Sequence, residues 1–332
     1  FFLKTFTLII LIVHGFKIID FNQFLLLYIF GYLSKLLFLL YFQISKNRIS
    51  FSYKISQLDF KNILTFGLYV FAGGLSIILV TRLDMIMIGY LIDLENVAFY
   101  TLAFFIGNAI AVPGRSVITI SVPLIAQAWQ KNNLDEIGVI YSKSAINQLI
   151  ISGFFFILIW LNIDDVFSLL PSKFTHGKWV VFYIGLAQLV NMACGVNGAI
   201  IVNSDYYKFD LYTNLFLLIV TIITNIILIP IYGIDGAAMA TAISLLLFNF
   251  IRVILIYIKM KIHPFSNKTL YTILILFVSY FICDFITLSS NIYLNIIIRS
   301  LISLIIFLPL CLKFNLSEDI SKLFNQIVKR FI

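Results

Sequence analysis

Charged side chains inside long apolar stretches are the residues of this sequence best placed to do chemistry. A charge in the middle of a lipid bilayer costs about 2.5 kcal/mol or more, so such a residue usually faces a cavity or a partner. The six that fit this description are Lys35, Arg82, Asp84, Arg115, Asp284 and Arg299. All six are candidates for function, although a structural role is favoured for Lys35 and for an Asp284–Arg299 pair.

Arg82 and Arg115 fall at different depths of two successive predicted helices. With a rise of about 1.5 Å per residue, Arg82 lies roughly 13 Å from Leu91 at the end of its helix, and Arg115 lies in the opposite half of the next one. Two cations at different depths could form a staged path for an anion. The alternative is that each extends to the headgroups or pairs with a carboxylate. Residues two apart do not face one another on a helix, so Asp84 need not pair with Arg82.

Uncharged polar side chains also recur inside the apolar stretches. Such groups could line a hydrophilic cavity that recognises sugar hydroxyls, or they could form interhelical hydrogen bonds worth about 0.6 kcal/mol each. These residues are Gln148, Gln188, Asn191, Asn197, Asn214 and Asn225. Gln188 and Asn191 join Arg82, Arg115, Lys35 and Asp84 as candidate substrate-binding residues.

The elements that position these groups are long apolar helices. The chain is 61% hydrophobic and 11% charged, with a mean hydropathy of +1.05, whereas soluble domains carry about 25% charged residues. About 20 apolar residues of helix cross a hydrocarbon core, and this length predicts about ten spans. They are residues 6–17, 21–41, 63–91, 97–124, 137–160, 179–202, 211–229, 233–258, 270–287 and 292–312. The sequence therefore predicts an all-α, polytopic membrane helix bundle, with helix-breaking residues at Gly73–Gly74 and Pro113–Gly114.

Basic residues collect in every second joint, which predicts the orientation of the spans. Short cytoplasmic joints carry an excess of Lys and Arg. The basic set comprises Lys46, Arg48, Lys54, Lys61, Lys131, Lys143, Lys208, Lys259, Lys261, Lys268, Lys322, Lys329 and Arg330. We expect those joints and the C-terminus in the cytoplasm. Trp129, Trp160 and Trp179 lie near predicted helix ends, where tryptophan marks the interfaces.

Several function classes are disfavoured by composition. The net charge of +8 is spread over separate joints and forms no single nucleic-acid face, so we expect contacts with membrane lipids and not with nucleic acid. Cys194, Cys283 and Cys311 lie in apolar helices without metal-ligand spacing, and no metal or cofactor is expected. The chain begins at Phe1 without an initiator Met, and we interpret it as the C-terminal part of a longer protein.

Short motifs resemble those of a known transporter family. The run Arg82-Leu-Asp84-Met-Ile-Met-Ile-Gly89 and the later Val97-Ala-Phe-Tyr100-Thr-Leu-Ala103 resemble the first helix pair of the second lobe in Wzx-type polysaccharide flippases. These belong to the superfamily that also contains multidrug and lipid II exporters. Two further segments resemble motifs that recur in the same family: Val122-Pro123-Leu124, which ends a long helix, and Pro230-Ile-Tyr-Gly233-Ile-Asp-Gly236, which joins two helices.

This resemblance implies two six-helix lobes that face each other across a central cavity, often with two further helices. It divides the chain into residues 1–43 as the last two helices of an incomplete first lobe, 44–62 as a cytoplasmic linker and 63–258 as a complete second lobe. Residues 259–313 would be two additional helices, and 314–332 a cytoplasmic amphipathic tail. Four helices of the first lobe would be missing. The family cavity commonly holds cations suited to a pyrophosphate, and Arg82 and Arg115 match that role by position.

The resemblance implies a transporter and not an enzyme. It would flip an undecaprenyl-pyrophosphate-linked oligosaccharide across the bacterial inner membrane. The oligosaccharide would become part of a surface polysaccharide such as the O-antigen of lipopolysaccharide. The protein partners that the resemblance suggests are a polysaccharide polymerase and chain-length machinery. One alternative is a cation-coupled multidrug antiporter of the same fold, for which Asp84 would be the acidic partner. Another is a membrane polysaccharide polymerase or glycosyltransferase. Asp164 and Asp165 could then be general acid and base, although a solvated turn is the simpler interpretation.

Overall fold

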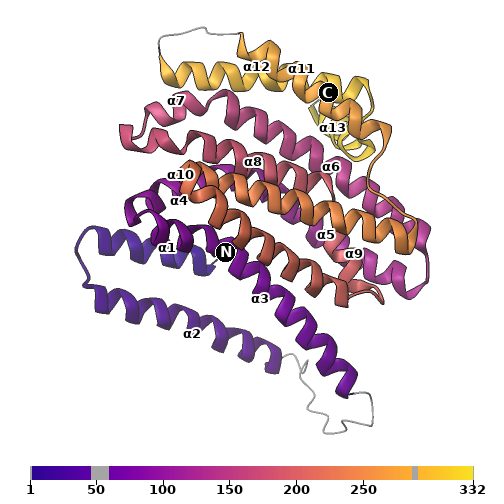
Figure 1. Ribbon diagram of the computed structural model, residues 1–332, viewed down its shortest axis with the longest axis horizontal. Helices are drawn as coiled ribbons and strands as arrows, with labels where there is room; N and C mark the ends of the chain where they lie inside the picture. The colour runs from indigo at the N-terminus through magenta and orange to yellow at the C-terminus, as the bar shows by residue number, and fades with distance from the viewer. Residues whose placement is uncertain (1, 46–59, 286–290, 332) are drawn as a thin grey trace. The chain divides into compact units, whose positions relative to one another are not determined.

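The computed structural model describes residues 2–45, 60–285 and 291–331, and every element within these ranges is helical (Figure 1). The 44–62 linker expected from the sequence lies largely outside the described residues. The helices are α1 (Phe2–Gly15), α2 (Phe21–Ser45), α3 (Phe60–Leu91), α4 (Leu94–Asn108), η1 (Ala109–Ala111), α5 (Val112–Gln130), α6 (Leu134–Leu161), α7 (Ile163–Ser168), η2 (Ser172–Gly177), α8 (Lys178–Ala193), α9 (Asn197–Asn203), α10 (Lys208–Met260), α11 (Asn267–Asp284), α12 (Ile292–Lys313) and α13 (Glu318–Phe331).

Each predicted membrane span overlaps one or more of these helices, and the last two residues of the span 270–287 lie outside the described residues. Six helical segments of the described chain are long and apolar enough to cross a membrane, and the bent pair Ser172–Ala193 and Asn197–Asn203 provides a seventh. Two predicted spans, 211–229 and 233–258, share the 53-residue α10. The first and ninth predicted spans correspond to α1, which is short, and α11, which carries Lys268 and Asp284 at its ends. The all-α, polytopic class is confirmed, and the chain is a membrane protein.

The chain forms two compact units, residues 1–60 and 61–332. The first contains α1 and α2, which pack against each other with the ring of Phe6 over Gly31. The second contains all later helices, and α8 contacts α4, α6 and α10. Helix α6 also packs against α5 and α11, and α12 packs against α11. The division of the chain into lobes, taken from the family resemblance, stays a prediction.

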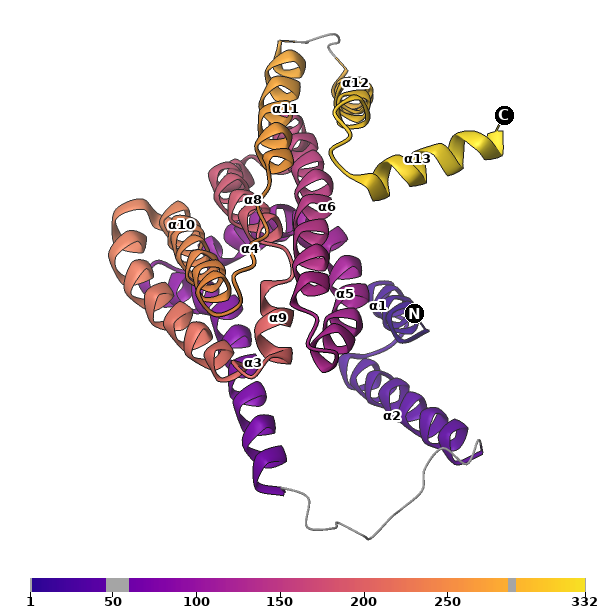
Figure 2. The same ribbon diagram turned by 90° about the vertical axis from the view of Figure 1, so that its right-hand side faces the viewer.

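Helix α10 is a hairpin of two antiparallel arms, 208–232 and 234–260 (Figure 2). The backbone turns at Gly233, which has φ 60° and ψ −135°, a conformation that glycine adopts without a Cβ penalty. Thr224 on the first arm contacts Ser244 on the second at 3.3 Å, and Thr213 contacts Arg252 at 3.1 Å. Because both pairs are centred within about one residue of Gly233, the arms run in opposite directions side by side.

Two breaks differ from their predicted positions. Helix α3 continues unbroken through Gly73–Gly74. In the next span the irregular turn is η1, a 3₁₀ turn that ends one residue before α5, and Pro113 lies in the first turn of α5. Proline is tolerated in a first helical turn because the N–H that it lacks has no intrahelical acceptor there. Pro113 therefore starts a helix and does not interrupt one.

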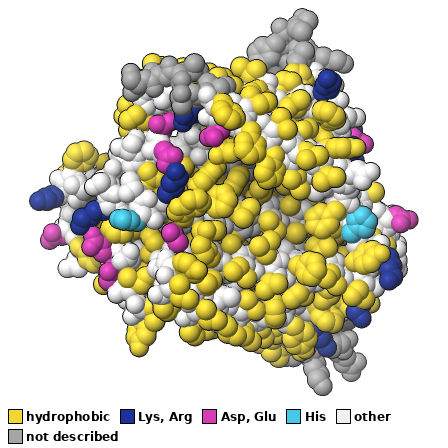
Figure 3. Space-filling model, turned by 45° about the horizontal axis from the view of Figure 1, so that its top comes forward, with side chains coloured by type: hydrophobic (Ala, Val, Ile, Leu, Met, Phe, Trp, Pro, Cys, Tyr) yellow, Lys and Arg dark blue, Asp and Glu magenta, His cyan; other side chains and the backbone are white. Residues whose placement is uncertain are grey.

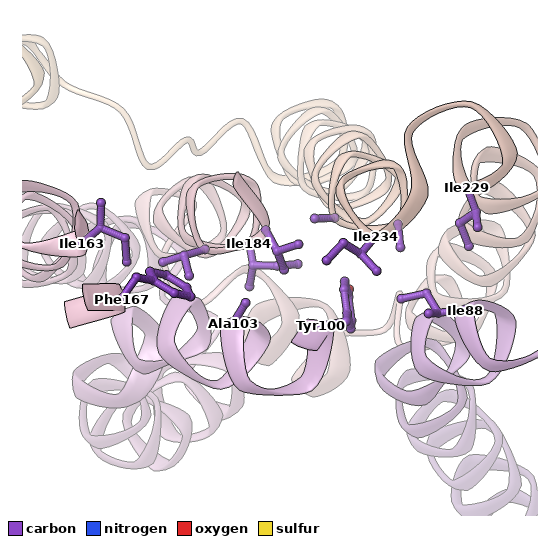
Figure 4. Close-up of a cluster of buried hydrophobic side chains, with 12 residues drawn as sticks. Ile88, Tyr100, Ala103, Ile163, Phe167, Ile184, Ile229 and Ile234 are labelled. Carbon is purple, nitrogen blue, oxygen red and sulfur yellow. The ribbon is translucent and has the colours of Figure 1, made fainter. Parts of the chain in front are cut away.

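The core of the second unit lies where α8 packs between α4 and α10. Tyr100 and Ala103 from α4, Ile184 from α8 and Ile234 from α10 are buried together (Figure 4). Ile163 and Phe167 of α7 extend this cluster at one end, and Ile88 of α3 extends it at the other. Burial of each large side chain contributes about 1.5–3 kcal/mol in water, and in lipid the same close packing supplies dispersion contacts.

The outer surface is strongly apolar. Hydrophobic side chains cover most of the face shown in Figure 3, and many large ones, such as Phe71, Ile86 and Phe250, are more than 60% exposed. Exposed apolar areas of this extent are not stable in water. They are suited to contact with lipid chains.

Candidate functional site

A cavity of about 390 Å³ lies within the second unit, between α3, α4, α5, α8, α9 and α10. Apolar side chains form most of its wall, including Val80, Phe104 and Phe248. Polar side chains enter it at several points: Thr81, Asp84, Gln188, Asn191, Asn197, Thr221, Thr241 and Arg252. An apolar cavity with a few convergent polar groups is the usual form of a small-molecule site.

The break between α8 and α9 shapes one wall of this cavity. The two helical segments are bent by 50°, and Gly195 and Val196 between them line the cavity together with Gly198 and Ala199. Gly195 has a φ of +60°, which is disfavoured for any residue with a Cβ. A Cβ at this position would lie 3.0 Å from Ser144 Oγ of α6. Glycine therefore permits both the bend and the close approach of α6.

Asp84 joins three helices at one end of the cavity. Its side chain is buried, with 3% exposure, and its carboxylate accepts hydrogen bonds from Tyr100 Oη (2.6 Å), Asn225 Nδ2 (2.8 Å) and Thr241 Oγ1. These donors come from α4 and from both arms of α10. No Lys, Arg or His within the described ranges forms an ion pair with Asp84. The carboxylate is thus stabilised by neutral donors alone.

Arg252 lies in the cavity wall on the second arm of α10. It is 4% exposed, pairs through Nη2 with Asp210 on the first arm, and donates from Nε to Thr213 Oγ1 (3.1 Å) and from Nη2 to Asn214 Oδ1 (3.1 Å). Its guanidinium carbon lies 4.1 Å from the ring centre of Phe248, a favourable cation–π geometry. A buried guanidinium held by several hydrogen bonds is well suited to bind oxygen atoms of a ligand.

A chain of amides connects α8, α9 and α10 beside the cavity. Asn249 Nδ2 donates to Asn191 Oδ1 (3.1 Å), and Asn197 Nδ2 donates to Asn249 Oδ1 (2.9 Å). Gln188 is half-buried and lines the cavity one turn before Asn191. Three of the six candidate binding residues, Asp84, Gln188 and Asn191, therefore line one cavity. Asn214 and Asn225 act as interhelical hydrogen-bonding groups, which is the alternative that the sequence left open.

The other three candidates do not line this cavity. Arg82 and Arg115 are exposed, and Arg82 lies on a different face of α3 from the buried Asp84. Lys35 is exposed on α2 in the first unit. Their role in substrate binding stays a prediction.

One expectation about charged groups is corrected, and one charged residue was missed. Arg299 bonds to Asp165 (3.2 Å) and to the carbonyl of Leu161 (3.2 Å), because α12 packs against the start of α7, so the predicted pair with Asp284 is wrong. Arg252 was missed by the sequence analysis although it lies within the predicted span 233–258. A charge six residues inside that span was the signal that could have identified it.

Ion pairs and a helix cap organise the joints at the α7 end of the second unit. Lys173 pairs with Glu95 (2.8 Å), and Lys178 pairs with Asp164 (2.6 Å). Asp93 caps α4, and its carboxylate accepts from the backbone N–H of Asn96 (2.7 Å) and from the Asn96 amide. The backbone hydrogen bond is the main reason that the pKa of Asp93 lies below its ordinary value. Such bonds favour the ionised carboxylate.

The comparisons with known proteins bear on the first five helices. No curated protein and no solved structure matched the chain. Residues 2–129, which extend from α1 to the penultimate residue of α5, match the model of a family described as polysaccharide biosynthesis protein, and this similarity indicates a role in polysaccharide biosynthesis.

Proposed function

We propose that the chain is part of a flippase that moves an undecaprenyl-pyrophosphate-linked oligosaccharide from the cytoplasmic to the outer leaflet of the bacterial inner membrane. The observation that carries this proposal is a cavity between membrane-spanning helices whose mostly apolar wall is entered by several polar side chains. The amides of Gln188 and Asn191 offer donors and acceptors for sugar hydroxyls, and Arg252 offers charge for a phosphate oxygen. The match to a polysaccharide biosynthesis family supports the same substrate class.

The transport step in this proposal is alternating access of two lobes. Residues 63–258 form the second lobe, residues 1–43 end the first, and 259–313 add two helices. The headgroup passes through the central cavity that the family resemblance implies, which is not the cavity described within the second unit. The exposed Arg82 and Arg115 meet the pyrophosphate on that path, while the prenyl tail stays in the bilayer. Arginine provides paired donors for phosphate oxygens. Motions of repeated helix bundles about a site near the bilayer midplane are a common transporter mechanism.

The proposed orientation places the basic joints and the C-terminus in the cytoplasm. Lys131 and Lys268 then lie on the cytoplasmic side, and the α7–η2 joint with its ion pairs faces outward. The product is surface polysaccharide, including the O-antigen part of lipopolysaccharide. A polymerase that acts on the outer leaflet and its chain-length machinery are the protein partners that we propose for it.

A cation-coupled multidrug antiporter is the second candidate, and Asp84 is the observation that favours it. A carboxylate in a cavity wall that forms no ion pair within the described ranges could hold a proton, a small cation or a cationic drug. Asp84→Asn distinguishes the two because it removes charge and keeps an acceptor for Tyr100 and Thr241. In the antiporter this change abolishes drug resistance, whereas in the flippase resistance does not depend on the protein.

An enzymatic function is the least favoured alternative in this proposal. The two adjacent acids that could serve as general acid and base are each engaged with a cation, since Asp164 pairs with Lys178 and Asp165 pairs with Arg299. A general base must reach the proton that it removes. These pairs support a structural role for the α7 turn.

The test uses a strain that lacks the full-length gene. The flippase proposal predicts that complete lipid-linked repeat units accumulate on the cytoplasmic leaflet, that surface polysaccharide is lost and that drug sensitivity is unchanged. Complementation with a Gln188→Leu/Asn191→Leu variant should fail, because apolar side chains cannot bond to hydroxyls. The matched control is Gln127→Leu on α5, which is exposed and outside the cavity, and it should restore polysaccharide.

Other outcomes point to the alternatives. Complete repeat units on the outer leaflet of the deletion strain, with no redundant flippase, would contradict the proposal. Single repeat units displayed outside would indicate a polymerase, and a shortened glycan would indicate a glycosyltransferase. Normal polysaccharide with increased sensitivity to cationic drugs would assign the chain to the antiporters.

A further inference from the structure

The joint between α12 and α13 is a tight turn that backbone hydrogen bonds close. Asn315 has a φ of 45°, the backbone N–H of Leu316 donates to the carbonyl of Cys311 (3.1 Å), and that of Asn315 donates to Leu312 (3.0 Å). This pattern ends a helix and turns the chain away from its axis. Leu316 is fully buried, in the same cluster as Cys311. The direction of α13 is therefore set where α12 ends.

The first turn of α13 is fixed to α6. Asn147 of α6 accepts a hydrogen bond from Ser317 Oγ and donates to Asp319 Oδ2 (2.8 Å). Lys143, one turn earlier on α6, pairs with Glu318 at 3.4 Å. Ser317 Oγ also accepts a hydrogen bond from the backbone N–H of Ile320 (3.2 Å), which caps the helix. Both acids of the first turn are thus engaged with α6.

Helix α13 crosses the direction of the spanning helix that precedes it. In Figure 2, α12 is seen nearly end-on while α13 is seen from the side. The 22 residues of α12 extend about 33 Å, enough to cross a hydrocarbon core. A helix that leaves the end of such a span at a steep angle lies along the membrane surface.

The sequence of α13 separates apolar from polar residues along its length. Ile320, Leu323 and Phe324 recur at helical spacing, and the sequence continues the pattern with Ile327, Val328 and Phe331. Ile320 packs against the cluster that contains Leu316, whereas Leu323 is 59% exposed and Phe324 is 37% exposed, so the stripe leaves the rest of the described chain after its first residue. Such a stripe opposite charged residues is typical of helices that lie in a membrane interface.

The charges of α13 indicate which membrane surface it contacts. Glu318 and Asp319 are held by α6, while Lys322 is exposed and forms no ion pair within the described ranges. The sequence adds Lys329 and Arg330 and no further acid. Lysine and arginine side chains at a bilayer surface attract anionic phospholipids.

We infer that α13 is a membrane-surface helix that lies in the headgroup region, with Leu323 and Phe324 inserted among acyl chains and Lys322 directed toward anionic headgroups. The occupant of this apolar face is the lipid surface and not a further protein. The inference is independent of the transported substrate, because α13 contributes no residue to the cavity.

The test measures the depth of single spin labels in the full chain in lipid nanodiscs that contain an anionic phospholipid. Labels are attached one at a time to Leu323→Cys, Phe324→Cys, and the matched neighbour Asn325→Cys on the polar side of the helix. The wild-type chain measures background labelling, since its three cysteines are buried. Collisions with oxygen, which dissolves in lipid, and with a water-soluble nickel complex report the environment of each label.

We expect the ratio of oxygen to nickel collisions to be several-fold higher at 323 and 324 than at 325. Equal ratios at all three positions, frequent nickel collisions at 323 and 324, or protection from both reagents would overturn the inference, because the last result means that protein covers the helix. Replacing the anionic lipid with a zwitterionic one, or introducing Lys322→Glu, should lower the ratio at 324. No change in either experiment would refute the role of anionic headgroups.

Discussion

Arg252 and Asp210 form a buried ion pair across the two arms of α10, at positions 42 residues apart in the chain. The pair lies beside the cavity, and Thr213 and Asn214 complete the hydrogen bonds of the guanidinium. It therefore closes the open end of the hairpin, opposite the turn at Gly233, and sets the spacing of the arms that carry Asn225 and Thr241.

Removing one partner of this pair should destabilise the fold more than removing both. Arg252→Met leaves the Asp210 carboxylate buried without its cation, which costs about 3–5 kcal/mol in comparable sites. The double variant Arg252→Met/Asp210→Leu should recover part of that loss. Thermal unfolding in detergent measures the effect. Lys173→Met, which removes the exposed pair with Glu95, serves as control and should leave the Tm unchanged; additive losses in the double variant would argue against direct coupling.

Gly195 and Gly74 should respond in opposite ways to alanine. Gly195 has a positive φ, and a Cβ in that conformation costs about 1–2 kcal/mol in addition to its contact with Ser144. Gly74 lies within α3 with open space around its would-be Cβ, so Gly74→Ala should stabilise the helix by about 1 kcal/mol. Differential scanning calorimetry of the two purified variants in detergent compares their Tm values with that of the wild type. A stabilising Gly195→Ala would mean that the α8–α9 break does not require glycine.

The cap at Asp93 should make part of the stability depend on pH. Hydrogen bonds from Asn96 lower the pKa of Asp93, so the ionised cap stabilises the fold above the pKa of the unfolded chain, near 3.8. This stabilisation should be lost as the pH falls from that value through the lower folded pKa. Wild type should therefore exceed Asp93→Ala in Tm at neutral pH and approach it in acid.

Asp93→Asn is the matched control for this prediction. Asparagine keeps a capping oxygen but does not titrate, so its advantage over Asp93→Ala should stay constant across the same pH range. If wild type and Asp93→Asn changed in parallel with pH, the dependence would have to arise elsewhere in the protein.

The proposed orientation predicts which joints face outward. Asn132, Ser172 and Ser266 are exposed and can each be replaced by cysteine in turn. An impermeant thiol reagent should label Ser172→Cys in intact cells and should label Asn132→Cys and Ser266→Cys only after the inner membrane is permeabilised. Labelling of Asn132→Cys from outside would reverse the orientation, and with it the assignment of a cytoplasmic C-terminus.

The sequence predicts the helices well because their signal is local. Length and hydropathy locate the spans, and the Pro230–Gly233 segment indicates the turn of α10. The α8–α9 break was missed because Gly195, in a run that continues the apolar pattern, gives no sign of the backbone strain that it relieves. Its reason is the close approach of Ser144 and Ala145 from α6, which no local pattern contains.

The site is less predictable because it depends on how each helix is rotated about its axis. Arg82 and Asp84 have similar sequence surroundings, yet one is exposed and the other is buried. The difference arises from Asn225 and Thr241, which approach one face of α3 from much later in the chain. For the same reason Arg252 could be recognised as a charge in a span, but its pairing with Asp210 required the hairpin geometry.

The hydrogen bonds of Asp84 also constrain the order in which the protein can be assembled. Tyr100 follows Asp84 by 16 residues, whereas Asn225 and Thr241 follow it by 141 and 157. Because ribosomes synthesise the N-terminal part first, Asp84 enters the bilayer long before two of its three donors exist. A nascent chain stalled before α10 would keep in the membrane an acid with only one of its three hydrogen-bond donors. Synthesis of the second arm of α10 supplies the last of these donors.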